Sequence, residues 1–481
     1  MSTDPFLTPS DDQRAYLAAR LGPRALSDID EGTIVVIPSL SFPPEELRKI
    51  LAIQHYEERL LFMTLLLDRP GIEMVYVTST PIPPSVIEYY MSFLEDPTGA
   101  VDRLHLVTLD DPAPVALTEK LIQRPDKIEE VKRRVSGQSY ALAFNVTPLE
   151  WRLMELLGVV VYGSHPELAG LGSKSGSRRI ARAAGVSVCD GAEDLTTLAE
   201  IESALRALHP RGSAVIKLNN GFSGQGNAIM GLEQLRFPLA DVDTVFCADE
   251  ESWHSFEGKI AKEGAVVEQL IREPGTVSPS VQLRIAADAS YEVVSTHDQI
   301  LGGPDDQVYL GCRFPADDSY RSQIQDAGRK IAAELAEKGV IGSFGVDFVV
   351  VPGAEPKIYM SEINLRMGGT SHPFYMARFA TGGHYDEATG HLMADGKKKF
   401  YVATDNLKSE RLIGTRPGAI FGALAAEGLA YESATKTGIT LHLLGALEGF
   451  GKLGCVAIGD SRAHAEELYE GLPEVLERLG A

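Results

Sequence analysis

The sequence predicts an α/β and α+β protein of several domains. Its 481 residues exceed the roughly 100 to 200 residues of a typical domain. Short β-rich segments alternate with helical patterns in the first third of the chain, two β-rich segments flank a Pro/Gly turn later on, and the composition changes near residue 400. We expect three units around a cleft: an N-terminal α/β domain over residues 1–166, an α+β core of two subdomains over 167–396, and a small C-terminal domain over 397–481.

The first unit alternates between strand and helix patterns, which is typical of a parallel sheet. Proline clusters follow two of the expected strands, where loops leave the ends of such a sheet. A long apolar-rich segment, residues 45–67, is predicted to be one helix. The expected strands are residues 33–40, 74–78, 103–109 and 159–162.

The middle of the chain reads as α+β. A Gly/Ser-rich stretch, residues 163–176, leads into a basic helix, 177–184, which Gly185 ends. The C-terminal unit is expected to contain a strand pair and a terminal helix over 461–479. The strands predicted for these two units are residues 214–218, 228–230, 265–271, 281–286, 344–351, 357–365, 438–444 and 454–458.

Composition narrows the functional class. A formal net charge of -22 opposes binding to a phosphate backbone, so nucleic acid is not expected as a partner. No apolar run approaches the roughly 18 residues of a membrane span, and the polar start at residues 1–4 does not resemble an export signal, so we expect a cytoplasmic protein. The four cysteines are scattered, which favours neither disulfides nor a zinc site.

A lysine-bearing strand is followed by a glycine-rich turn and a returning strand, over residues 214–230. Glycines in this turn permit close backbone approach to an anion, and Lys217 would neutralise a bound polyphosphate. The spacing matches neither the G-x-G-x-x-G nor the G-x-x-x-x-G-K-[ST] motif, which excludes the ordinary Rossmann and P-loop interpretations. A glycine-rich hairpin without a ligand remains the alternative.

A second hairpin, residues 344–366, carries sparse polar groups in otherwise apolar strands. If residues 353–356 form a four-residue loop, Asp347 lies directly opposite Glu362, and Asn364 shares the face of Glu362. Two carboxylates and an amide oxygen on one face would suit Mg²⁺ bridging nucleotide phosphates. A carboxylate pair on a solvent-exposed face is the alternative.

A helix is predicted to begin directly after this hairpin, with Thr370 or Ser371 as its N-cap. Its free amides would suit a substrate carboxylate or an acyl-phosphate, with Arg366 as a fixed cation. His372 is as consistent with a structural hydrogen bond as with catalysis. The substrate-contact candidates in this segment are Arg366, Gly368, Gly369, Ser371 and His372.

Lys174 before a helix, Lys217 with its glycine flap, a Val-Glu-Gln-Leu-Ile strand, Asp347 and Glu362-x-Asn364-x-Arg366 occur in the order found in ATP-grasp enzymes. Over about residues 165–395 the chain resembles that family. The resemblance implies that Lys174 and Lys217 contact phosphates of ATP, and that Asp347, Glu362 and Asn364 hold Mg²⁺, with Mn²⁺ as an alternative ion. The flap that would close over the phosphates is Ser223, Gly224, Gln225, Gly226 and Asn227.

The resemblance also places the adenine against the backbone of Glu268, Gln269, Leu270 and Ile271. Either Glu268 or Glu273 would contact the ribose, and the choice stays open. Arg366 would lie near the transferred phosphate or the acyl group.

More narrowly, the segments Gly-Phe-Ser-Gly-Gln-Gly-Asn and Asn-Leu-Arg-Met-Gly-Gly-Thr-Ser-His-Pro resemble those of pheganomycin-type peptide ligases. That resemblance implies a carboxylic acid or amino acid as donor, an amine, amino acid or peptide as acceptor, and a homodimer at the level of a family expectation. Further substrate candidates come from the residues alone: Arg284 is on an expected strand, and Gln299 and Arg313 flank a Gly/Asp-rich loop, residues 302–311. A surface or structural role is equally consistent for each.

The resulting hypothesis is a ligase that forms an amide bond through an acyl-phosphate and releases ADP and phosphate. Catalysis would come from positioning and charge stabilisation, with Arg366, Arg284 and Lys217 as the catalytic candidates. The alternatives are an ATP-grasp kinase or carboxylase, and a regulatory protein that binds ATP without turning it over.

Overall fold

The N-terminal unit is a parallel α/β sandwich, as predicted. We describe a computed structural model, which covers residues 10–135, 137–209, 212–221, 226–233, 235–236, 238–239, 242–248, 251–302 and 308–479. Five parallel strands run in the order β3-β2-β1-β4-β5. Both faces of this sheet are covered, which explains the continuous apolar strands. The strands are β1 Glu31–Ile37, β2 Gly71–Thr78, β3 Leu104–Thr108, β4 Ser139–Ala143 and β5 Val160–Val161.

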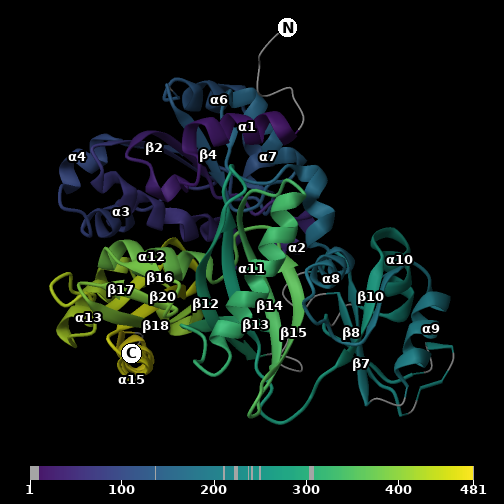
Figure 1. Cartoon of the computed structure of the whole chain (residues 1–481). Coiled ribbons are helices and arrows are strands. Elements are labelled where there is room, and N and C mark those ends of the chain that lie inside the picture. The colour runs from purple at the N-terminus through teal and green to yellow at the C-terminus, as the bar shows by residue number, and fades with distance from the viewer. Residues whose placement is uncertain are drawn as a thin grey trace, which may run out of the picture.

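Helices flank this sheet at the top of the molecule (Figure 1). Most begin with a proline in the first turn, where no amide hydrogen bond is lost. They are α1 Ser10–Leu21, α3 Pro84–Met91, α4 Pro97–Asp102, α5 Leu117–Ile122, α6 Pro125–Lys132 and α7 Pro148–Leu157.

The single helix predicted over residues 45–67 is wrong. The chain forms a short helix α2, Pro44–Leu47, and a separate 3₁₀ helix η2, Ile53–Asp68, which follows Ala52 in a left-handed conformation. Tertiary contacts replace regular helical bonding here: the carbonyl of Glu57 accepts a hydrogen bond from Tyr76, and the Glu57 carboxylate accepts two from Ser79. Burial of the segment on all sides overrides the helical periodicity.

The first subdomain of the core is a small antiparallel sheet in the order β6-β10-β7-β8-β9, with helices packed on it. It lies apart from the other sheets at the right of Figure 1, and α8 stands between it and the central sheet. Its elements are α8 Lys174–Ala183, β6 Gly191–Leu195, α9 Leu198–Leu208, β7 Ser213–Leu218, β8 Asn227–Gly231, β9 Thr244–Phe246, α10 Trp253–Glu263 and β10 Ala265–Leu270.

The second subdomain and the C-terminal unit share one sheet. Its strands run in the order β15-β14-β11-β12-β13-β18-β17-β16, and β20 pairs with β18 while β19 pairs with β20. The expected boundary between residues 396 and 397 falls inside a hairpin of this sheet. The strands are β11 Pro279–Ile285, β12 Tyr291–Gly302, β13 Val308–Phe314, β14 Gly342–Val351, β15 Lys357–Asn364, β16 His384–Asp386, β17 His391–Ala394, β18 Lys397–Lys408, β19 Gly438–His442 and β20 Lys452–Gly459.

Aromatic contacts join the N-terminal unit to the rest of the molecule. Phe62 stacks on Tyr375 at a centroid distance of 5.4 Å, and Tyr89 stacks on Phe421 at 4.5 Å. Both contacts belong to one apolar core that spans the N-terminal and C-terminal units. The remaining helices are α11 Arg321–Glu337, α12 Ser371–Thr381, α13 Pro417–Ala426, α14 Gly445–Phe450 and α15 Arg462–Leu479.

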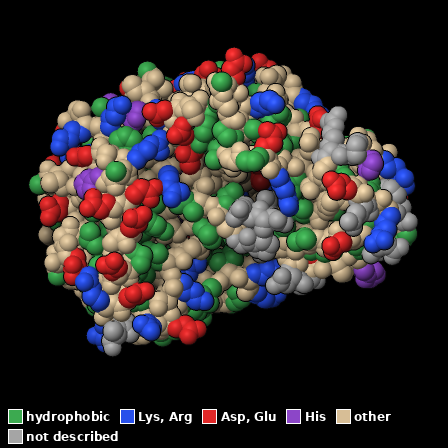
Figure 2. All heavy atoms as spheres, turned by 90° about the horizontal axis from the view of Figure 1, so that it is seen from below, with side chains coloured by type: hydrophobic (Ala, Val, Ile, Leu, Met, Phe, Trp, Pro, Cys, Tyr) green, Lys and Arg blue, Asp and Glu red, His purple; other side chains and the backbone are tan. Residues whose placement is uncertain are grey.

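Acidic and basic side chains are interspersed over the face seen from below, and the described part of that face shows no continuous basic region (Figure 2). None of the described helices is long and apolar enough to cross a membrane.

Candidate active site

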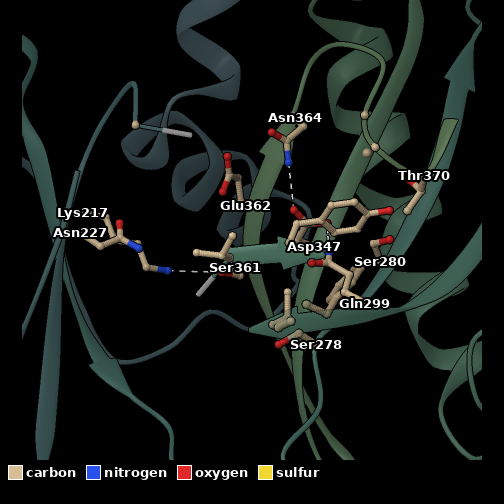
Figure 3. A pocket seen from close by; sticks show the side chains of 18 of the residues that line it. Lys217, Asn227, Ser278, Ser280, Gln299, Asp347, Ser361, Glu362, Asn364 and Thr370 are labelled. Carbon is tan, nitrogen blue, oxygen red and sulfur yellow. Dashed lines mark hydrogen bonds between the residues drawn. The ribbon is translucent and has the colours of Figure 1, made fainter. Parts of the chain in front are cut away.

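A large cavity of about 610 Å³ opens where the three units meet. Two sheets face one another across it: Lys217 and Asn227 project from the small sheet, and Asp347, Gln299 and Asn364 project from the central sheet (Figure 3). The sequence-predicted residues that line the cavity are Lys174, Lys217, Asn227, Glu268, Gln269, Leu270, Ile271, Gln299, Asp347, Glu362, Asn364, Arg366, Gly368 and Gly369. Ser223, Gly224 and Gln225 lie outside the described residues, as do residues 303–307 of the expected Gly/Asp-rich loop.

Lys217 projects from β7 into the cavity and is held by a buried carboxylate. Its Nζ lies 2.7 Å from Oε2 of Glu268, and Arg178 on α8 pairs with the other oxygen of the same carboxylate. Burial opposes the charged lysine, but Glu268 outweighs that effect, so the pKa of Lys217 rises and the ammonium stays charged. A fixed positive charge therefore lies where the sequence predicted a phosphate contact.

Lys174 begins α8 and spans the space between the two sheets. Its Nζ lies 2.7 Å from Oε1 of Glu362 on β15 and donates a 2.9 Å hydrogen bond to the carbonyl of Gly221. Ser173 caps the helix through the amide of Gly176. Lys174 thus connects the glycine-rich turn of one subdomain to the hairpin of β14 and β15 in the other. We call this hairpin the metal hairpin, after the ion that the sequence predicts for it.

In the metal hairpin Asp347 lies opposite Glu362, as predicted, but the turn length and the strand pairing that produce this register differ from the prediction. The turn contains five residues, 352–356, because Val351 pairs with Lys357. The four-residue loop predicted from the sequence is therefore wrong. A bulge at Ser361 adds one residue to β15 and restores Asp347 opposite Glu362. The Ser361 hydroxyl points into the cavity and accepts a 3.4 Å hydrogen bond from Lys217.

Asp347 is half-buried in the cavity floor, between two amides. Nε2 of Gln299 donates to its Oδ1 at 2.8 Å, and Nδ2 of Asn364 donates to its Oδ2 at 3.0 Å. Burial, reinforced by the neighbouring carboxylate of Glu362, raises the pKa of Asp347 to about 7. The site therefore favours the arrival of a cation, which would stabilise the ionised carboxylate.

The donor set fits Mg²⁺ bound partly through phosphate. Asp347, Glu362 and Asn364 supply hard oxygen ligands, and the described residues contain no cluster of three or more His, Cys, Asp or Glu that would form a complete protein cage. Coordination by Asn364 requires its amide to turn, because its Oδ1 now accepts a 3.2 Å hydrogen bond from Arg366. Arg366 also donates to the carbonyl of Met367 at 3.0 Å.

The segment after the hairpin divides into cavity-lining and structural residues. Gly368 and Gly369 line the cavity, and a Cβ at Gly369 would lie only 2.7 Å from the ring of Tyr309, so glycine is needed for that approach. Ser371 is the first residue of α12, and its hydroxyl accepts from the amide of Gly368. His372 is buried outside the lining, 3.0 Å from His442, and burial lowers its pKa well below the usual value.

Three other candidates lie outside the cavity lining. Arg284 is buried between units and donates to Glu292, the hydroxyl of Tyr162 and the carbonyl of Pro23. Arg313 is half-exposed and pairs with Glu466 on α15. Glu273 is exposed in a turn. Of the two ribose candidates, Glu268 alone lines the cavity, where Lys217 and Arg178 engage its carboxylate.

Sequence reasoning missed a second charged group in the same cavity. Arg59 and Tyr56 come from η2, Asp405 comes from β18, and Lys452 begins β20. Arg59 donates to Asp405 at 3.3 Å, and Lys452 donates to the hydroxyl of Tyr56 at 2.6 Å. The only available signal was a charged pair, Glu58 and Arg59, inside an apolar segment, which a solvent-facing helix position also explains.

The curated relative that matches is L-propargylglycine–L-glutamate ligase of Streptantibioticus cattleyicolor, which is 32% identical over 453 residues and covers 90% of this chain and 92% of the relative. Family models also match: "IQCH-like, ATP-grasp" over residues 239–388 and "PGM1 C-terminal domain" over residues 419–472. This chain belongs to the ATP-grasp family of carboxylate–amine ligases.

Solved structures show the same fold as this ATP-grasp ligase. Biotin carboxylase of Campylobacter jejuni superposes with a TM-score of 0.56 at 12% identity, over 90% of this chain and 89% of that one. N5-carboxyaminoimidazole ribonucleotide synthetase of Thermus thermophilus superposes with a TM-score of 0.52 at 14% identity, over 93% and 98%.

Proposed function

We propose that this ATP-grasp ligase joins the carboxylate of one amino acid to the amine of a second amino acid or of a peptide. The observation that carries the proposal is the cavity itself, which is lined by Lys174 and Lys217 from one subdomain and by Asp347 and Glu362 from the other, with Lys174 paired to Glu362 across it. The name of the curated relative, a ligase for two amino acids, supports the substrate class.

ATP would lie between the two sheets. The backbone of residues 269–271 borders the side of the cavity that would hold the adenine, while Lys174 and Lys217 would neutralise the phosphates. Asp347, Glu362 and Asn364 would hold Mg²⁺, which supplies charge neutralisation to the phosphates when it is bound.

The reaction would proceed in two displacements. An oxygen of the donor carboxylate attacks the γ-phosphorus of ATP, the bond to the bridging oxygen breaks, and ADP leaves from an acyl-phosphate. The acceptor amine then attacks the acyl carbon, loses a proton, and expels inorganic phosphate. Arg366 lies beside the metal hairpin, where its fixed charge would stabilise the acyl-phosphate. Such a mechanism needs positioning and charge, and no protein nucleophile.

The test measures ADP and phosphate release with Mg-ATP against pairs drawn from the proteinogenic L-amino acids and L-propargylglycine, with mass spectrometry of the products. We expect release that requires both partners, and a product lighter than their sum by one water. AMP and pyrophosphate as products would exclude the acyl-phosphate route. Phosphate retained in the product would indicate a kinase, bicarbonate dependence a carboxylase, and nucleotide binding without turnover a regulatory protein.

A further inference from the structure

The cavity extends beyond the phosphate and metal residues into the junction of all three units. Arg59, Asp405 and Lys452 line this extension, and these residues are 8%, 5% and 6% exposed. Charged groups buried to this degree are costly unless a partner satisfies them. Their presence in a cavity wall therefore calls for a ligand of matching charge.

The Arg59 guanidinium is only partly satisfied. One nitrogen, Nη1, donates to Oδ2 of Asp405 at 3.3 Å, whereas the buried Nε has no hydrogen-bond partner. The guanidinium plane is held by the rings of Tyr56 and Phe144, whose centroids lie 4.7 and 4.9 Å from Cζ. Arg59 is thus fixed in orientation but retains a free donor.

Positive charge exceeds negative charge at this junction. Arg366 lies 5.8 Å from the centroid of the same Phe144 ring, so two guanidiniums contact one aromatic side chain. Lys452 donates to Tyr56, and no described carboxylate forms an ion pair with Lys452 or Arg366. Arg59 and Lys452 therefore share the single carboxylate of Asp405, whereas the carboxylates of Glu362 and Asp347 offset the charge of Arg366. An anion is the ligand that would balance the remaining positive charge.

Asp405 lies where the pairing of β18 with β20 is irregular. The register between β18 and β20 shifts between Thr404 and Leu407, so Asp405 lies in an irregular segment of β18. Such irregularities re-aim side chains at ligand sites. Asp405 accepts a hydrogen bond from only one nitrogen of Arg59, so the other guanidinium nitrogens do not bond to it.

We propose that this junction binds the non-reacting carboxylate of an amino-acid substrate, through Arg59 and Lys452. This inference rests on the proposed function and names how one substrate is recognised. Arg366 lies between the junction and the metal hairpin. A substrate bound at Arg59 would therefore extend toward the place proposed for the acyl-phosphate. Two sources share this chemistry: the α-carboxylate of the acceptor and the second carboxylate of an acidic amino-acid donor.

The experiment measures binding by calorimetry, using the full chain with Mg-ADP. Each proteinogenic L-amino acid is compared with its α-carboxamide, and L-glutamate and L-aspartate are compared with L-glutamine and L-asparagine. We expect wild-type protein to bind one class of carboxylate about 10-fold or more tightly than its amide, because a charge-assisted pair is lost. Loss with the α-carboxamides identifies the α-carboxylate, and loss with the side-chain amides identifies the second carboxylate.

Arg59→Lys and Lys452→Met should each reduce this preference toward parity, while Mg-ADP affinity stays unchanged. Lys397→Met is the matched control, because Lys397 is 66% exposed on β18 and pairs with Asp460. If Arg59→Lys no longer binds Mg-ADP, that variant is misfolded, and the carboxylate preference of Lys452→Met then tests the proposal. Equal binding of acids and amides by wild type, retention of the preference in the variants, or no amino-acid binding would each overturn the proposal.

Product formation separates this inference from the proposed function. Amide synthesis without a carboxylate preference leaves the ligase function intact and removes the carboxylate site. A carboxylate preference that depends on Arg59, in a protein that forms no amide from any pair, leaves the site intact and removes the proposed reaction.

Discussion

Glu362 connects the two halves of the nucleotide site, since it faces Asp347 on its own sheet and pairs with Lys174 across the cavity. The substitution Glu362→Gln removes one negative charge from the proposed metal site and removes the partner of Lys174. We expect kcat to fall by about 10² or more, as for loss of a preorganised electrostatic group. Steady-state ADP release measures this change.

Glu355→Gln is the matched control, because Glu355 is exposed in the turn of the same hairpin. It should turn over at the wild-type rate. Near-wild-type turnover by Glu362→Gln would remove the metal assignment.

Ionisation of Glu57 makes the stability of the fold depend on pH, independently of the active-site chemistry. Burial raises its pKa from 4.5 to about 7, even though Ser79 donates two hydrogen bonds to it. The folded protein binds more protons than the unfolded chain between these values, so stability is full below about pH 4.5 and is lost as the pH rises through about 7. The loss amounts to roughly 3 kcal/mol when ionisation is complete.

Glu57→Gln should remove this dependence. Thermal midpoints measured from about pH 5 to pH 8 should show wild type losing stability relative to the variant as the pH rises. Parallel curves for the two proteins would contradict the shifted pKa.

Residue identities predicted which side chains line the cavity around Lys217 and Asp347, but not those that line it around Arg59. Lys217 and Asp347 could be found because alternation along a strand fixes the direction of a side chain, whereas Lys174 was found through the resemblance to ATP-grasp enzymes. Arg284 was misplaced because strand alternation defines a face but not what covers it, and here Tyr162 and Pro23 cover it. Arg59 was missed because its partner Asp405 lies 346 residues away in the sequence.

At the scale of elements, the bulge at Ser361 decides whether the hairpin can form the site. Side chains alternate between faces with a period of two, so one extra residue in β15 sets the face on which Glu362 and Asn364 appear. Deleting Ser361 should move both side chains out of register with Asp347. Mg-ATP affinity should fall by about 10-fold or more, measured by equilibrium dialysis, because charge-assisted contacts are lost.

Deleting Ala354 is the control, since it shortens the exposed turn by one residue and leaves the bulge in place. Circular dichroism establishes that both variants fold. Wild-type affinity after deletion of Ser361 would show that the carboxylate pair does not depend on the bulge.

Element types were largely predictable, whereas irregular elements were not. Apolar patterns located twelve of the described strands to within a few residues, because packing against a core imposes such patterns. The strands that were not predicted are β4, β6, β9, β12, β13, β16, β17 and β18. The 3₁₀ segment η2 and the bulge escaped because both depend on tertiary contacts, such as the hydrogen bond from Tyr76 to the carbonyl of Glu57. Sheet continuity from β13 into β18 was equally invisible, because the two strands are far apart in sequence.

At the scale of the whole molecule, the cavity exists because three units are held in one arrangement. The N-terminal unit supplies Arg59, the core supplies the nucleotide residues, and the C-terminal unit supplies Asp405 and Lys452. The shared sheet fixes the last two units relative to each other. The N-terminal unit is held to the others by the shared apolar core, by a backbone hydrogen bond from Met367 to Phe144, and by side-chain contacts that include those of Arg284.

Arg284 helps to hold the N-terminal unit by donating from β11 to Tyr162 at 3.0 Å and to the carbonyl of Pro23 at 2.9 Å. Its pKa is raised: burial opposes the charge, but Tyr162 and Glu292 outweigh that effect, so the guanidinium remains charged. Arg284→Met leaves these acceptors without their donor and should lower the free energy of unfolding by about 2 to 4 kcal/mol. Arg313→Met, which removes an exposed pair with Glu466, should cost less than about 1 kcal/mol.

Urea unfolding measures both effects, and ADP release well below the unfolding midpoint measures catalysis. We expect Arg284→Met to retain kcat within a few fold, because its guanidinium contacts Tyr162, Pro23 and Glu292 rather than the cavity. If kcat instead falls by about 10² in a fully folded variant, Arg284 takes part in catalysis, because that is the size of loss expected for a preorganised catalytic charge. Retained kcat with reduced stability would instead show that Arg284 acts by holding the N-terminal unit, which supplies Arg59 to the cavity, against the central sheet.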